Sequence, residues 1–72
     1  MTPGQCKAAR ALLDWTQLTL ANKANVSKST VADFERYVRT PVPNNLKAFI
    51  SVFEAEGLTF FKGGVVFNDE EV

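Results

Sequence analysis

The side chains best suited to chemistry lie between residues 27 and 40, where hydroxyl, carboxylate and basic groups are interspersed with apolar ones. If this stretch is helical, one outward face carries Lys28, Ser29, Asp33 and Arg36 together with the small Ala32. Such groups donate and accept hydrogen bonds and carry charge, as a recognition surface requires. The alternative for each single charge is an ordinary solvated side chain.

The rest of the composition argues against an enzyme. The chain has no histidine and one cysteine, Cys6, so it lacks the commonest general base, a zinc-ligand set and an intramolecular disulfide. Cys6 lies at helical spacing with Ala9 and Leu13, which predicts a small core residue rather than a reactive thiol. No nucleophile–base pair occurs, and Gly63-Gly64 is too short for a phosphate loop. We therefore expect no catalytic residue, metal, cofactor or small-molecule ligand.

The size and charge of the chain point to one small domain with two electrostatic halves. Its 72 residues carry eight basic and eight acidic side chains, and zero net charge at first argues against a nucleic-acid binder. By segment, however, residues 1–15 carry +1, residues 16–47 carry +3 and residues 48–72 carry −4. Neutrality is thus an average over a basic middle and an acidic end.

The sequence shows no sign of a membrane or of export. No apolar run approaches the roughly 20 residues of a membrane span. Residues 1–5 lack the basic and apolar regions of a signal peptide. We expect a cytoplasmic protein.

Start signals recur along the first part of the chain and predict four helices. Thr2, with Pro3 and Gln5, has the form of a capping box for a helix over residues 3–13. Thr16 and Ser27 are suitable caps for two further helices. The predicted second and third helices cover residues 17–24 and 28–37, and the fourth runs from Asn44 or Asn45 to a stop at Gly57.

The pattern changes after Gly57. Residues 58–61 and 65–67 are β-branched or aromatic, and Gly63-Gly64 between them predicts a tight turn. The expected fold class is mainly α, with four helices and a C-terminal β-hairpin. We expect residues 1–57 and the hairpin with its acidic tail, residues 58–72, to form one compact unit.

The spacing within residues 17–35 indicates two short helices that cross at a large angle. Ala21 provides a small residue where the backbones approach, and Asn25 tolerates the left-handed conformation that the turn requires. Apolar anchors fix the angle: Leu20, Val26, Val31 and Phe34. The alternative is an ordinary antiparallel helix pair in a small bundle.

Over roughly residues 3–53 the chain resembles the helix-turn-helix domains of Cro/C1-type (XRE family) bacterial and phage repressors. The similar stretches are residues 8–13, 15–17, 26–31 and 33–36, followed by Arg39-Thr40-Pro41. The tail from Glu56 is similar to that of a group of short bacterial members with a Gly-x-x-Phe strand and a glycine turn. The resemblance implies a lambda-repressor-like domain that binds double-stranded DNA, with its third helix in the major groove.

The resemblance also implies roles for individual residues. Lys28, Ser29, Thr30 and Asp33 are expected to contact base edges. The expected phosphate contacts come from the start of the second helix and from both sides of the 39–43 linker: Gln17, Arg36, Arg39, Thr40, Asn44 and Asn45. Arg10 and Glu35 match a pair that forms an ion pair between the first and third helices of several relatives.

Three positions depart from the pattern of the family. Asn25 and Tyr37 stand where many relatives have glycine, and Tyr37 leaves the end of the third helix open. Leu18 occupies a position of the second helix that is usually polar. It is either an isolated exposed residue or part of a contact surface.

The aromatic C-terminal half suggests a homodimer. A two-stranded hairpin leaves unpaired edges, and six phenylalanines are hard to bury within so small a monomer. The expected interface is Phe60, Phe61, Val65, Val66 and Phe67. We therefore predict a transcriptional regulator, a repressor that binds a short inverted repeat as a homodimer; the alternative is an antitoxin or other protein-interaction module with the same fold.

Overall fold

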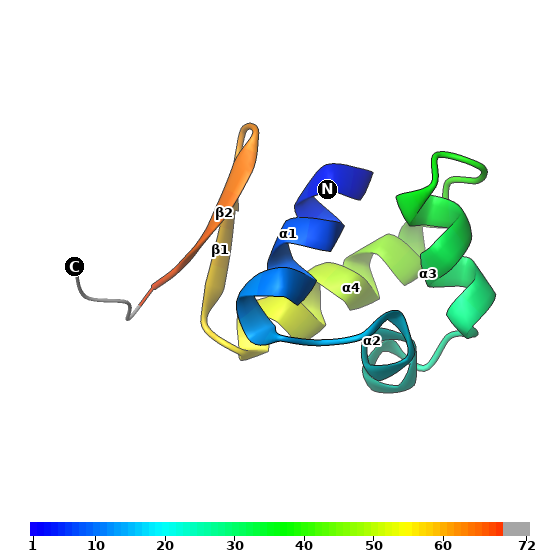
Figure 1. Ribbon diagram of the computed structural model, residues 1–72, viewed down its shortest axis with the longest axis horizontal. Helices are drawn as coiled ribbons and strands as arrows, with labels where there is room; N and C mark the ends of the chain where they lie inside the picture. Colours follow the sequence, from blue (N-terminus) through cyan, green and yellow to red (C-terminus); the bar gives the residue numbers. More distant parts are fainter. Residues whose placement is uncertain (69–72) are drawn as a thin grey trace.

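Four helices and a two-stranded antiparallel sheet make up the computed structural model, which describes residues 1–68 (Figure 1). The order is α1 (Pro3–Leu13), α2 (Gln17–Ala24), α3 (Lys28–Glu35), α4 (Pro43–Ala55), β1 (Leu58–Phe61) and β2 (Gly64–Phe67). The mainly α fold class with a C-terminal hairpin is confirmed. Along the longest axis, 35 Å, α2 and α3 lie at one end and the hairpin at the other, with α1 and α4 between them (Figure 1). The predicted acidic tail from residue 69 onward lies outside the described residues.

The first three helices begin at the predicted caps. Thr2 and Gln5 form the full capping box, since each side chain accepts a hydrogen bond from the other residue's backbone N–H, at 2.8 and 3.1 Å. The hydroxyls of Thr16 and Ser27 each accept from the backbone N–H three residues further on, at 3.0 and 3.2 Å. Local polar chemistry therefore sets where these helices start.

The end of α3 differs from the prediction by two residues. The helix stops at Glu35 rather than at Tyr37, because Tyr37 has a φ of 62° in the left-handed region. The N–H of Val38 donates to the carbonyl of Asp33 at 2.8 Å, and that of Tyr37 to Phe34 at 3.1 Å. This is the Schellman arrangement, in which the left-handed position usually belongs to glycine. A bulky aromatic residue thus occupies a strained backbone position.

The turn between α2 and α3 and the start of α4 have different origins. Asn25 has a φ of 59°, which confirms it as the left-handed turn residue. The predicted start of α4 at Asn44 or Asn45 is wrong by at least one residue, because Pro43 is already helical. Val42 precedes it without a side-chain cap, so the fixed φ of proline at the first helical position starts the helix.

The hairpin turns on Lys62 and Gly63 rather than on two glycines. Phe61 pairs with Gly64 at the end of the ladder, and Gly63 alone of the two glycines has a positive φ, 85°. Gly64 belongs to β2, and a Cβ at this position would overlap the ring of Phe61. The side-chain amide of Gln5 donates to the carbonyls of Phe61 and Gly64 at 2.6 and 3.1 Å. The hairpin is thereby fastened to the first turn of α1.

A continuous apolar core joins the helix-turn-helix to the hairpin. Phe53 is fully buried at its centre, with the rings of Trp15 and Phe60 each 5.8 Å away. The other residues of the core are Cys6, Ala9, Leu20, Ala21, Ala24, Val31, Phe34, Phe49 and Leu58. Because it draws on all four helices and β1, the position of α3 depends on the packing of the whole chain.

The strained residue at the end of α3 gives a prediction about stability. Tyr37 is 74% exposed, and its ring contributes a cation–π contact with the Lys7 ammonium, 5.9 Å from the ring centroid. We expect Tyr37→Gly to raise the free energy of unfolding by about 0.5–1 kcal/mol, because relief of left-handed strain exceeds the loss of an exposed contact. Urea unfolding measures the change.

Val38→Gly is the matched control, because Val38 is also exposed but does not have a positive φ. That variant is expected to lower the free energy of unfolding by about 0.5–1 kcal/mol. Equal destabilisation by both substitutions would show that Tyr37 carries no strain.

Candidate nucleic-acid interface

The α2–α3 pair has the geometry of a helix-turn-helix. Ala21 and Val31 are fully buried where the two helices meet, and the left-handed Asn25 reverses the chain between them. The predicted anchors Leu20 and Phe34 are also buried. Figure 1 shows α3 at the edge of the molecule beside α2, with its outer side free of other elements. In Figure 1 α2 is seen nearly end-on and α3 from the side, so the two helices cross at a large angle and are not an ordinary antiparallel pair.

The outer side of α3 carries the residues predicted to read bases. Lys28 and Ser29 are exposed, and Asp33, one turn further along, is half-buried. Thr30 is less free, because its hydroxyl forms a hydrogen bond of 2.9 Å with that of Ser27 at the helix cap. Three of the four predicted base-reading side chains therefore lie on the open face, and the fourth takes part in the cap.

Asp33 lies in a small cleft between α3 and the α3–α4 loop. Arg36 donates to its carboxylate at 3.1 Å. The cleft has a volume of about 180 Å³, and Arg39 lines it from the loop side. Its remaining lining is Ser27, Ser29, Thr30 and Pro41. The arrangement brings one carboxylate, one guanidinium and three hydroxyls to the same side of α3.

The predicted phosphate-contacting residues are not equivalent. Arg39, Thr40 and Asn44 are exposed around the α3–α4 loop and the start of α4, and Asn45 is half-buried. Arg36 is exposed but is paired with Asp33. The amide of Gln17 donates to Glu35 at 3.0 Å, so its side chain is directed into the protein.

Glu35 is the centre of a buried polar network. Arg10 binds it through two parallel hydrogen bonds, Nε to Oε2 at 2.7 Å and Nη2 to Oε1 at 2.6 Å. The predicted ion pair is therefore present in the structure, with the Glu35 side chain 2% and the Arg10 side chain 18% exposed. Arg10 also donates to the carbonyl of Trp15 at 2.9 Å, and Gln17 adds the third donor to the carboxylate. The network joins α1, the α1–α2 turn, α2 and α3.

The donors keep Glu35 ionised despite its burial. Burial alone raises the pKa of this carboxyl, but hydrogen bonds from Arg10, Gln17 and Cys6 outweigh that effect, so the pKa lies below its ordinary value. The hydrogen bond to Glu35 also raises the pKa of Arg10. A charge this well satisfied holds α3 at one angle to α1.

Sequence reasoning missed two members of the network, Gln17, which was assigned to a phosphate, and Cys6. The thiol of Cys6 donates to Glu35 Oε2 at 3.1 Å, and burial raises the pKa of this thiol well above its ordinary value. The prediction of a small buried core residue is confirmed, since Cys6 is fully buried. Its position one turn before Arg10 was the available signal, because residues four apart share a helix face. Nothing in the spacing indicated that the thiol would face a carboxylate.

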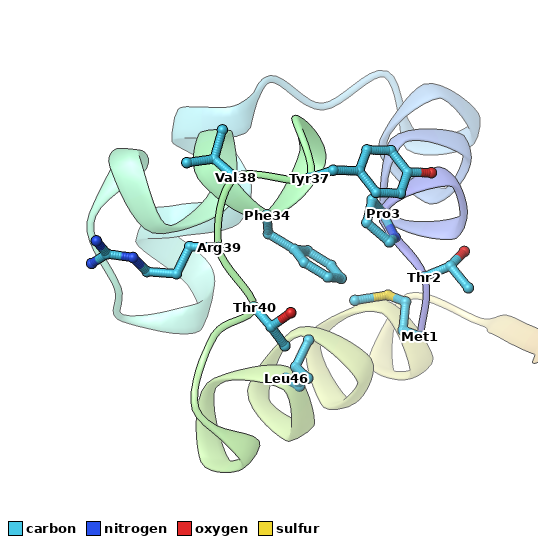
Figure 2. Close-up of a pocket in the computed structure, with 9 residues that line it drawn as sticks. All are labelled: Met1, Thr2, Pro3, Phe34, Tyr37, Val38, Arg39, Thr40 and Leu46. Atoms are coloured by element: carbon cyan, nitrogen blue, oxygen red, sulfur yellow. The ribbon is translucent and has the colours of Figure 1, made fainter.

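A larger hollow lies between the N-terminus and the α3–α4 loop. Its volume is about 360 Å³, and Figure 2 shows Phe34, Met1 and Leu46 pointing toward its interior. Tyr37 lies beside Pro3, while Arg39 points away from the hollow (Figure 2). The hollow thus has a mixed lining with apolar side chains at its centre, whereas the smaller cleft is lined mainly by polar side chains.

The residues predicted for the dimer interface divide between two faces of the hairpin. Phe60, Val65 and Phe67 pack against the core of their own chain. Phe61 and Val66 face outward and are 52% and 46% exposed. On α2, Leu18 is 52% exposed. Within residues 1–68, no helix is long and apolar enough to cross a membrane, and no group of side chains could hold a metal ion.

A polar, exposed α3 that follows α2 across a left-handed turn, with the small Ala21 buried on α2, defines the class of helix-turn-helix DNA-binding regulators. The Helix-turn-helix family model HTH_3, which describes Cro/C1-type domains, matches residues 7–60. The chain belongs to this family, whose members generally bind DNA and are not enzymes. A search of curated proteins gave no significant match.

The buried carboxylate gives a prediction about acid stability. We expect Glu35→Gln to lower the free energy of unfolding at neutral pH by about 3–5 kcal/mol, because Arg10 loses its partner. The pKa of Glu35 is lower in the folded than in the unfolded protein. The ionised carboxylate therefore stabilises the fold at pH values above the unfolded pKa of about 4.3, and this stabilisation is lost as the pH falls through the folded pKa. The difference in free energy of unfolding between wild type and Glu35→Gln should therefore become smaller below about pH 4.

Gln17→Ala is a milder variant that removes one donor and should cost about 1 kcal/mol. Urea unfolding of all three proteins between neutral and acidic pH provides the measurement. A wild-type–variant gap that stays constant over this range would show that the ionised carboxylate does not stabilise the fold.

Proposed function

We propose that the protein is a sequence-specific transcriptional regulator, a repressor that acts by occupying a short inverted repeat in double-stranded DNA. The observation that carries this proposal is the open polar face of α3. Three hydrogen bonds from α1 and one from α2 to the Glu35 carboxylate hold α3 in place. In this proposal Lys28, Ser29 and Asp33 read base edges, and Thr30 contributes beside the cap.

The distribution of charge supports DNA binding at the α3 end. Arg39 and Lys28 lie exposed at the α3–α4 loop and the start of α3. Glu54 and Glu56 are exposed at the end of α4, next to the hairpin and far from α3 along the longest axis (Figure 1). Acidic groups so placed do not oppose the phosphates directly. Arg39, Thr40, Asn44 and Asn45 are the proposed backbone contacts.

We infer a homodimer formed through the hairpin. Its outer face exposes Phe61 and Val66, and a two-stranded sheet has two unpaired edges. Because α3 and the hairpin lie at opposite ends of the molecule, the two protomers must incline toward one side. Only then do both α3 helices meet successive turns of the major groove, about 34 Å apart.

The proposal also covers catalysis, ligands, location and protein partners. The protein is proposed to act without catalysis, cofactor or small-molecule ligand, in the cytoplasm and on the nucleoid when DNA-bound. A protein partner is the second candidate, favoured by the exposed Leu18 on α2. In that case the chain is an antitoxin-like interaction module, and it does not bind DNA.

Salt dependence tests DNA binding. We expect the affinity for a labelled duplex pool to fall steeply between low and moderate salt, because each phosphate contact releases counterions. Lys28→Ala should mainly relax preference among sequences, whereas Arg39→Ala should weaken binding to all of them and reduce the salt slope by about 1. Fluorescence anisotropy titrations at several salt concentrations give both quantities.

Lys62→Ala is the charge-matched control, because Lys62 is exposed at the hairpin turn, away from α3. It should leave affinity and slope within about twofold of wild type. Absence of binding at low salt would contradict the DNA proposal and favour the protein-partner alternative. Equal losses on specific and random DNA for Lys28→Ala and Arg39→Ala would contradict the proposed division of roles.

The dimer has its own test. Val66→Lys places a charge on the outer hairpin face and should convert the dimer to monomer, as measured by sedimentation equilibrium. Val38→Lys makes the same change at an exposed site at the α3 end and should leave the dimer intact. A wild-type protein that sediments as a monomer would overturn the proposed interface, and so would dissociation by both variants.

A further inference from the structure

Asp33 is an unusual residue for a surface expected to meet DNA. It is the one acidic side chain on the open face of α3, since Glu35 points into the core with 1% exposure. A carboxylate facing a major groove is repelled by the phosphates. Its presence there is favourable only where a hydrogen-bond donor of the DNA lies opposite it.

The surroundings of Asp33 limit which hydrogen-bond donors can reach its carboxylate. Its carboxylate takes one hydrogen bond from Arg36 at 3.1 Å and is 30% exposed. An ionised carboxyl has about four acceptor sites, so most of its capacity remains open. The cleft around it holds hydroxyls and the Arg39 guanidinium in a volume of about 180 Å³. A single protruding polar group is of the size and chemistry that this cleft admits.

The Arg36 side chain is bound to Asp33 and is not free to contact a phosphate. Its guanidinium reaches back one turn to Asp33 on the same helix. Arg36 is largely exposed, so the pair adds little stability. Beside DNA the same contact restricts the orientation of the carboxylate and offsets part of its charge.

From this geometry we propose that Asp33 selects, at one position of each half-site, a base whose exocyclic amino group enters the cleft, and that Arg36 is the positioning residue for its carboxylate. The inference rests on the proposed DNA-binding function and specifies its base preference. In the major groove only cytosine N4 and adenine N6 are amino donors. Guanine O6 and thymine O4 are acceptors, so they oppose the carboxylate.

The same carboxylate lowers affinity for every sequence that places guanine or thymine, rather than the amino-bearing base of the pair, against the cleft. This effect agrees with the low net charge of the chain, since a neutral protein gains specificity by rejecting wrong sites rather than by binding all DNA tightly. Asp33 therefore contributes to discrimination without adding to general attraction.

Selection from a random duplex pool, with the full chain and sequencing of the bound fraction, tests the proposal. Wild type should prefer cytosine or adenine at one half-site position by about tenfold or more. Asp33→Asn should shift this preference to adenine, which an amide binds through N6 and N7, and should tighten binding to random duplexes several-fold. Asp33→Ala should remove the preference at that position and leave the other positions unchanged.

Arg36→Ala separates the positioning role from a phosphate contact. As a positioning residue, Arg36 affects the preference at the Asp33 position more than at any other, so the variant should reduce that preference severalfold. Arg39→Ala, the matched loss of a guanidinium, should weaken binding to all sequences and keep the preference. Preferences unchanged by Asp33→Ala, or a uniform loss of affinity for Arg36→Ala, would overturn this inference while leaving DNA binding intact. Absence of salt-dependent binding by wild type would overturn the proposed function and this inference together.

Discussion

The structure depends most on one buried carboxylate. Glu35, at the last turn of α3, receives two hydrogen bonds from Arg10 of α1 and one from Gln17 of α2, and the thiol of Cys6 supplies a fourth. A buried charge costs several kcal/mol unless its hydrogen bonds are satisfied. The requirement to satisfy it therefore leaves few allowed positions for α3 relative to the helices behind it. Because the network fixes the C-terminal end of α3, the side chains on the outer face of this helix are held in a defined orientation.

The two ends of α3 are fixed by local structure, and each end positions residues of the proposed DNA-binding face. At the start, the Ser27 cap orders the first turn, where Lys28 and Ser29 face outward. At the end, Tyr37 accepts a left-handed backbone, which directs the α3–α4 loop and Arg39 back toward Asp33. The strain at Tyr37 is the kind of cost that persists where the surrounding structure fixes a conformation. The hairpin, joined to α1 by Gln5, lies far enough away to be available for pairing of two copies.

Features set by local chemistry could be read from the sequence. The caps at Thr2, Thr16 and Ser27 and the left-handed Asn25 depend on neighbouring residues, and the helix starts and the end of α2 that they predict agree with the structure. The end of α3 was misplaced because a tyrosine rather than a glycine takes the left-handed position, where the backbone N–H groups of Tyr37 and Val38 close the helix end. The role of Gly64 was misread because it depends on the ring of a cross-strand neighbour. The resemblance to the family supplied the pairing of Arg10 with Glu35, but the donors Cys6 and Gln17 lie 29 and 18 positions away, which periodicity does not address. The ion pair between Arg36 and Asp33 could not be predicted from the sequence pattern either.

The central claim is that α3 and its supporting loop form the surface that meets DNA. Amide chemical-shift mapping by NMR tests it most directly, with a short duplex added to the labelled protein at low salt. The account predicts the largest shifts at residues 28–40 and at the start of α2, with the amides of β1 and β2 little changed. Shifts that centre on the hairpin or on Leu18 of α2, or no shifts at saturating duplex, would contradict it.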